Sequence, residues 1–168
     1  MENSVYCLAT SEPQANAILT HLRNLGFTSS EVSILLDDKK TKNISVKEDA
    51  IRGVEKGGLI GGALGAIAGF TALGIATLGP LMAAGPVVAA LGGAAVGVVV
   101  GGLAAGSGAL THIGIPSQAA DRIHTQLLSN GAILIMVHSA DPVRRDKALR
   151  VFKSAGATEI YSPDELAA

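Results

Sequence analysis

The sequence predicts an α+β fold: a ferredoxin-like, split β-α-β domain into which a glycine-rich apolar helical hairpin is inserted. Both ends of the 168-residue chain show a strand pattern, a capped helix with an early proline, a glycine stop and a second strand. Between them, a run of 64 residues from Gly57 to Ala120 lacks any Asp, Glu, Lys or Arg. Without that run and the helix that follows it, the order is β-α-β-β-α-β. Its sheet has helices on one face, and leaves the other face to a partner, a third helix or a membrane surface.

The first half begins with a short strand pattern at residues 4–9. Ser11 and Gln14 then fit a capping box that starts a helix, and Gly26 is placed to end it in a left-handed conformation. Apolar residues alternate again at residues 32–36, as in a second strand. The helix between the strands has one apolar face, formed by Ala15, Ile18, Leu19, Leu22 and Leu25.

The central run predicts two long apolar helices, Gly57–Thr77 and Val87–Ala109, joined by a turn at Gly79–Pro86. Helices of about 21 to 23 residues are roughly 32–35 Å long, which matches a hydrocarbon core of ~30 Å. We therefore expect a transmembrane hairpin in a bacterial inner membrane. The base-rich residues 39–56 keep the soluble domain on the cytoplasmic side. The alternative is a cytoplasmic protein in which the hairpin is buried inside a soluble oligomer.

Glycine spacing in this run predicts self-association. Between Gly57 and Gly108 the run holds 16 of the chain's 21 glycines, and many recur every fourth residue. Small residues at this spacing line one helix face and let two backbones approach closely. We expect helix packing and a homo-oligomer through a glycine zipper of Gly57, Gly61, Gly65, Gly69, Gly93, Gly97 and Gly101.

The remainder of the chain resumes a soluble pattern. A helix is expected from Pro116 to Asn130, followed by a nearly continuous apolar strand at residues 132–137, which is typical of a central position in a sheet. Asp141 and Pro142 start a last helix. A final strand is expected at residues 158–161. The divisions are thus residues 1–38, the charged linker 39–56, the hairpin 57–110, and the extra helix with the second half of the domain at 111–168.

No pattern for chemistry stands out. The single cysteine, Cys7, excludes an internal disulfide, and the four histidines lack metal-ligand spacing. We expect no enzyme, no cofactor and no metal. With 3% aromatics and a net charge of −1, nucleic acid is not an expected partner. No secretion signal is expected at Met1. His112 is interpreted as a cap at a helix end, or alternatively as a proton-sensitive group. A basic face on the last helix is a candidate for lipid-headgroup contact: Arg144, Arg145, Lys147 and Arg150.

The chain resembles the bacterial general-stress (heat-induced stress, YflT-like) proteins, and more narrowly their glycine-zipper membrane subgroup. The resemblance is carried by the first β-α-β, the glycine-rich insertion, His112-Ile113-Gly114-Ile115-Pro116, the helix after it, and the strand from Gly131 to Val137. Ser117, Gln118 and His124 stand where such proteins tend to carry acidic residues and Tyr. The resemblance implies a stress-associated protein with no established catalytic activity, and supplies no active-site residues.

These observations together predict a non-enzymatic, stress-associated membrane protein that homo-oligomerises and serves in scaffolding or membrane protection. The alternatives are a ligand-binding regulatory module, whose small-molecule ligand the sequence does not specify, and a soluble oligomeric assembly with the apolar hairpins as its core. A channel is disfavoured by the lack of polar lumen-facing residues.

Overall fold

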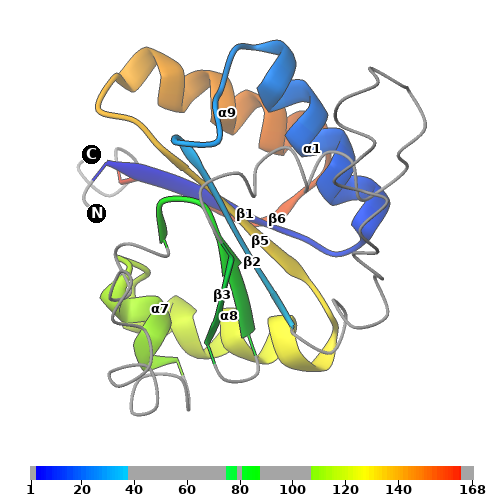
Figure 1. Cartoon of the computed structure of the whole chain (residues 1–168), viewed down its shortest axis with the longest axis vertical. Helices are drawn as coiled ribbons and strands as arrows, with labels where there is room; N and C mark the ends of the chain where they lie inside the picture. The colour runs from blue at the N-terminus through cyan, green and yellow to red at the C-terminus, as the bar shows by residue number, and fades with distance from the viewer. Residues whose placement is uncertain (1–2, 38–74, 79–80, 88–106, 164–168) are drawn as a thin grey trace.

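The computed structural model describes residues 3–37, 75–78, 81–87 and 107–163. These residues form an α+β fold with an antiparallel sheet in the strand order β3-β4-β2-β5-β1-β6 (Figure 1). The α+β prediction is confirmed at this level. The strands are β1 (Ser4–Ala9), β2 (Val32–Asp37), β3 (Ile75–Leu78), β4 (Leu81–Ala84), β5 (Ile133–His138) and β6 (Thr158–Tyr161). The helices are α1 (Glu12–Asn24), α7 (Gly108–His112), α8 (Ser117–Ser129) and α9 (Pro142–Ser154).

The predicted caps define the ends of α1 and α9. Ser11 Oγ accepts a hydrogen bond from the Gln14 N–H at 3.4 Å. The Gln14 side chain accepts in return from the N–H of Thr10, at 2.8 Å. Gly26 follows α1 with φ +80°, a left-handed conformation that favours glycine. Asp141 caps α9 through its side chain. Local sequence signals therefore determine where α1 and α9 begin and where α1 ends.

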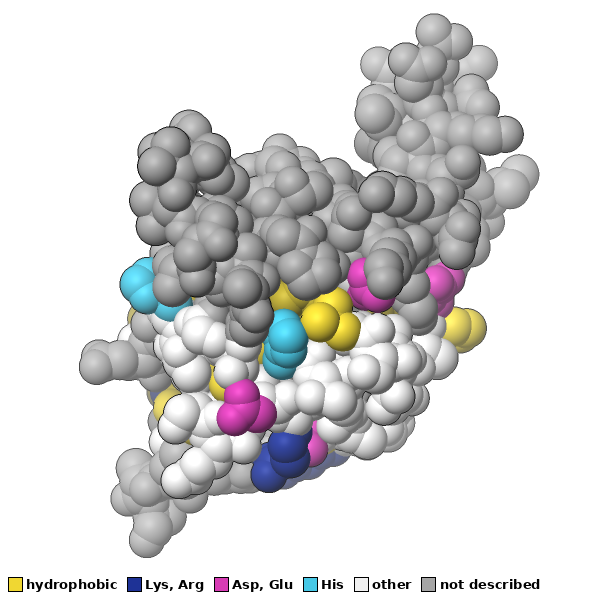
Figure 2. Space-filling model, turned by 90° about the horizontal axis from the view of Figure 1, so that it is seen from below, with side chains coloured by type: hydrophobic (Ala, Val, Ile, Leu, Met, Phe, Trp, Pro, Cys, Tyr) yellow, Lys and Arg dark blue, Asp and Glu magenta, His cyan; other side chains and the backbone are white. Residues whose placement is uncertain are grey.

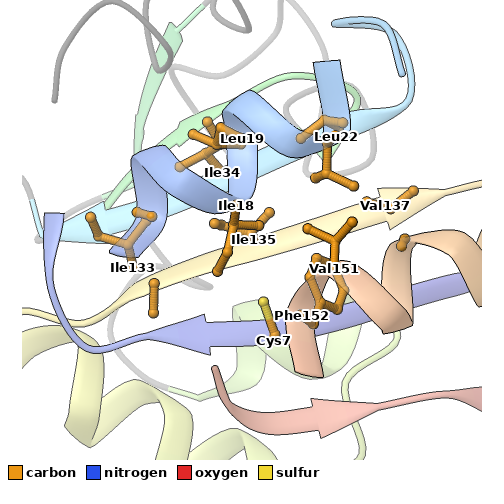
Figure 3. Close-up of a cluster of buried hydrophobic side chains, with 14 of the residues drawn as sticks. Cys7, Ile18, Leu19, Leu22, Ile34, Ile133, Ile135, Val137, Val151 and Phe152 are labelled. Atoms are coloured by element: carbon orange, nitrogen blue, oxygen red, sulfur yellow. The ribbon is translucent and has the colours of Figure 1, made fainter. Parts of the chain in front are cut away.

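The sheet is covered on both faces. The helices α1 and α9 lie over one face, and α7 and α8 lie over the other (Figure 1). Alternate side chains of β1, β2 and β5 pack under α1 and α9 in the first core, which includes Cys7, Leu19, Ile135 and Phe152 (Figure 3). The second core lies beneath α8, against Leu8, Leu35, Leu134 and Met136. The sequence left the second face to a partner, a further helix or a membrane surface. The structure shows that a helix, α8, covers it.

The central run departs from the predicted pair of helices. β3 begins at Ile75, inside the expected helix Gly57–Thr77, and β4 lies in the expected turn. β4 pairs with β2, and β3 pairs with β4. The helical prediction is wrong at these residues, because short apolar runs do not distinguish strand from helix by periodicity, and because the free edge of β2 offers backbone partners. Residues 85–87 and 107–110 of the predicted hairpin are also described, whereas its residues 57–74, 79–80 and 88–106, and the linker 39–56, lie outside the described residues.

The described helices also correct the membrane prediction. In residues 3–37, 75–78, 81–87 and 107–163, no helix is long and apolar enough to cross a bilayer. The transmembrane and membrane predictions are contradicted by this finding, and placement in the inner membrane is unsupported. The physical reason lies in the described part of the run, where apolar side chains are covered by protein: Leu81, Ala83, Val87, Leu110, Ile113 and Ile115.

Candidate functional site

Three polar side chains meet at one end of the sheet, on the face covered by α8. Ser4 begins β1, Ser33 is the second residue of β2, and His138 ends β5. The antiparallel register places Ser4 opposite His138. β2 pairs with β5 on the other side of that strand. The three side chains therefore lie on neighbouring strands, on the face of the sheet that α8 covers.

The histidine ring joins the two serines. Ser4 Oγ lies 2.7 Å from His138 Nδ1, and Ser33 Oγ lies 2.7 Å from His138 Nε2. Ser33 Oγ also accepts a hydrogen bond from the backbone N–H of Val87 at 2.9 Å. We call Ser4, Ser33, His138 and the N–H of Val87 the His138 cluster. It connects the first residues after β4 to three strands that are distant in sequence.

The direction of these hydrogen bonds follows from the burial of Ser33. Its side chain is fully buried. Its oxygen accepts from Val87, so its own proton needs an acceptor, and His138 Nε2 supplies one. The neutral imidazole then carries its proton on Nδ1 and donates it to Ser4 Oγ. The cluster is thus a directed chain from Val87 through Ser33 and His138 to Ser4.

Burial keeps this imidazole uncharged near neutral pH. Desolvation is the main cause that lowers the pKa of His138 to about 4, from an ordinary value of 6.5. A neutral ring matches the assigned direction, because only an unprotonated Nε2 can accept the proton of Ser33.

A close backbone contact brings Val87 to the cluster. Gly85, Pro86 and Val87 form what we call the 85–87 segment, which follows β4. Gly85 has φ +90°, and a Cβ added there would lie 2.2 Å from the carbonyl oxygen of Val32. Only glycine lets the chain pass β2 at this distance. The N–H of Val87 can therefore reach Ser33, the residue that follows Val32 on β2.

The geometry of the cluster suits a structural role better than nucleophilic catalysis. A hydroxyl that donates to an imidazole is the pair used in nucleophilic catalysis, with a third group orienting the ring. Here Ser33 would be that hydroxyl and Ser4 the orienting group. Ser33 is fully buried, however, and its oxygen is already bonded to Val87. In this arrangement the cluster ties chain segments together and presents no accessible nucleophile.

A second group of side chains lies on the same face of the sheet, at the edge formed by β6. Tyr6 and Tyr161 stack with ring centroids 4.8 Å apart, and Arg122 of α8 pairs with Glu159 of β6 at 3.0 Å. Burial, and to a smaller extent the nearby Tyr161 and Glu159, raise the pKa of Tyr6 to about 12. Glu159 has φ +47°. These contacts fasten the last strand to β1 and α8.

The basic residues predicted on the last helix have different surroundings. Arg144 pairs with Glu31 at 2.8 Å and lies 4.5 Å from the ring centroid of Phe27. Arg145 is buried and donates to the carbonyl oxygens of residues 139 and 140. Lys147 and Arg150 are exposed. Two of the four side chains therefore serve contacts within the chain.

The other predicted residues divide by location. All seven glycines of the predicted zipper lie outside the described residues: Gly57, Gly61, Gly65, Gly69, Gly93, Gly97 and Gly101. His112 is the last residue of α7, and His124 lies on α8. In the view from below, the visible charged and histidine side chains are interspersed and form no patch of one sign (Figure 2). Among the described residues, no group of three or more His, Cys, Asp or Glu could hold a metal ion.

Comparisons of the chain with protein-family models, with curated proteins and with solved structures found no match. The candidate site therefore has to be judged by its own geometry.

The sequence prediction missed the His138 cluster. It treated His138 as one of four scattered histidines and did not select Ser4 or Ser33. A weak signal was present, since each is a polar residue in a strand position on an inward face. The register that joins them spans more than a hundred residues, and strand periodicity alone does not specify it.

Proposed function

We propose that this chain is a non-enzymatic structural module whose uncharged run packs against protein, first within its own fold and then between copies. The observation that carries this proposal is the burial of the run's described apolar residues. Val87 and Leu110 are 0% exposed, and Ile113 is 1% exposed. They lie in one core with α8 and the sheet. Burying such side chains contributes about 1.5–3 kcal/mol each, so the run stabilises the fold it interrupts.

Strand order supports a ferredoxin-like assignment for this module. The order β2-β5-β1-β6, with α1 and α9 on one face, agrees with a split β-α-β unit. The β3–β4 hairpin extends that unit at the edge of β2, and α8 covers its second face. We propose that the β3–β4 hairpin and α8, rather than the split β-α-β unit to which they are added, are central to the module's function.

Glycine spacing supports assembly between copies. Between Gly57 and Gly108 the run contains 16 of the 21 glycines, and their four-residue recurrence allows close backbone packing in protein as well as in lipid. We infer a homo-oligomer in which these residues meet, and a scaffolding or protective role consistent with the resemblance to general-stress proteins. A small-molecule regulatory module is less well supported, because α8 covers the sheet face that could have offered it an open surface.

Mass measurement without detergent tests this proposal. We expect light scattering after size-exclusion chromatography to give a discrete oligomer for the parent chain. Gly61→Val combined with Gly65→Val should yield a smaller species, because valine side chains hold the backbones apart. Gly108→Ala is the control, because an added Cβ there meets nothing within 4 Å.

Two outcomes would contradict the proposal: a parent chain that is monomeric without detergent, or a double variant with an unchanged mass. Cys7 reports whether each variant is folded, since its thiol is fully buried in the first core. A variant that reacts with a thiol reagent as fast as denatured protein would be set aside in favour of Gly65→Ala, a smaller change at the same expected face.

A further inference from the structure

The His138 cluster is the described polar contact that ties the 85–87 segment to three strands. Ser33 Oγ accepts the Val87 N–H at 2.9 Å, and His138 Nε2 accepts the Ser33 proton at 2.7 Å. Ser33 and Val87 are both fully buried. The segment's position therefore depends on a hydrogen-bond chain that passes through a titratable ring.

Protonation of that ring would break the chain at Ser33. A charged imidazole donates from both nitrogens, so Nε2 would become a donor towards Ser33. Ser33 Oγ would then receive protons from both Val87 and His138, and its own proton would lose its acceptor. A buried donor without a partner is costly, and the charge on the ring would itself be poorly solvated. Moving the 85–87 segment away relieves both penalties, because it admits water and removes the Val87 donor.

We propose that His138 is a proton-sensitive latch, which in its neutral form holds the 85–87 segment against β2 and on protonation releases it. The latch acts on the segment through which β4 connects to the rest of the uncharged run. It is independent of whether the chain assembles with other copies.

In the part of the chain that the structure describes, the charged and titratable groups around this ring lie on the elements next to it. Glu31, just before β2, accepts the backbone N–H of His138 with its carbonyl, while its carboxylate pairs with Arg144. Arg145 donates to the two carbonyls that follow His138. The other charged or titratable groups on the neighbouring elements are Tyr6 and Cys7 on β1, Asp37 at the far end of β2, His112 on α7, and Asp121, Arg122 and His124 on α8. Burial lowers the pKa of His138 most, and the amino terminus adds a smaller effect in the same direction.

The sign of the pH effect follows from these values. The ring has a pKa of about 4 in the latched state and an ordinary value of 6.5 when freed. Between these values the released state binds more protons, so the latched state loses stability as pH falls. The latch is fully effective above pH 6.5, and it weakens progressively towards pH 4.

Thiol labelling at position 87 measures release directly. Val87→Cys in a Cys7→Ala background places one buried thiol on the 85–87 segment, and a pyridyl disulfide labels it in acid as well as at neutral pH. Combining these changes with His138→Gln retains an amide that can accept from Ser33 but does not titrate. The labelling rate with His138 present, divided by the rate of the His138→Gln variant, should rise on the order of tenfold or more from pH 7 to pH 4. The unmodified chain, labelled at Cys7, serves as the control for global unfolding.

Three results would overturn the latch. The pH profiles with and without His138→Gln could run parallel, or the labelling rate at position 87 could be independent of pH. Position 87 could also be labelled only at pH values at which Cys7 of the unmodified chain is labelled as well. Nitrogen-15 NMR of the unmodified chain tests the same inference if Val87→Cys fails to fold. We expect the ring proton on Nδ1 at pH 7, and a Val87 amide resonance that shifts with the ring's own midpoint. A ring protonated on Nε2 at pH 7 would contradict the proposal equally.

Discussion

At the scale of single residues, Gly85 bears two constraints that no other residue type meets. Its φ of +90° is disfavoured for residues with a side chain, and its missing Cβ leaves room for the Val32 carbonyl. Together they set the path by which the chain leaves β4 and reaches the His138 cluster.

We predict that Gly85→Ala destabilises the fold by more than the cost of its backbone conformation. That cost alone is roughly 1–2 kcal/mol. The added Cβ would overlap the carbonyl at 2.2 Å, so β2 or the 85–87 segment must also shift. Thermal and urea unfolding measure the difference from the parent chain.

Gly26→Ala is the matched control for this variant. Gly26 has φ +80°, but an added Cβ there meets nothing within 4 Å. Its loss of stability therefore estimates the conformational cost without the clash. Equal losses for the two variants would show that the contact with Val32 is not as close as described.

At the scale of elements, Arg144 fastens α9 to the loop between α1 and β2. Its guanidinium pairs with Glu31 at 2.8 Å, donates to the carbonyl oxygen of Gly26, and lies over the ring of Phe27. The side chains of this ion pair are only 31% and 24% exposed, so solvent screens it less than a fully exposed pair.

We predict that Arg144→Ala lowers the free energy of unfolding by about 1–2 kcal/mol, through loss of the ion pair and the cation–π contact. Lys147→Ala on the same helix should change it by less than about 0.5 kcal/mol, because Lys147 is exposed. Urea unfolding of both variants makes the comparison. Equal effects would mean that Arg144 is as solvated as its neighbour.

The helices were the most predictable elements because their signals are local. The capping pair Ser11 and Gln14 and the cap Asp141 define starts that the structure confirms. β3 and β4 were not predictable in the same way. Their four-residue apolar stretches satisfy either period, and the edge of β2 that selects a strand is formed by residues far along the chain.

At the scale of the whole molecule, the uncharged run is the feature that sequence alone misplaced. Length and lack of charge favoured lipid as its surroundings. In the described part of the chain, α8 and the second face of the sheet provide apolar surroundings instead. The candidate site was missed for a related reason, since Ser4, Ser33 and His138 come together only through the pairing of three strands.

The measurement that tests the central claim most directly is hydrogen–deuterium exchange of the full chain in detergent-free buffer. If the run packs against protein, the backbone amides of β4 and of the 85–87 segment should be protected from exchange about as well as those of β2 and β5. Exchange there at the rate of an unstructured peptide, while β2 and β5 stay protected, would contradict the claim. The run would then be a separate element that the module carries, and not part of its core.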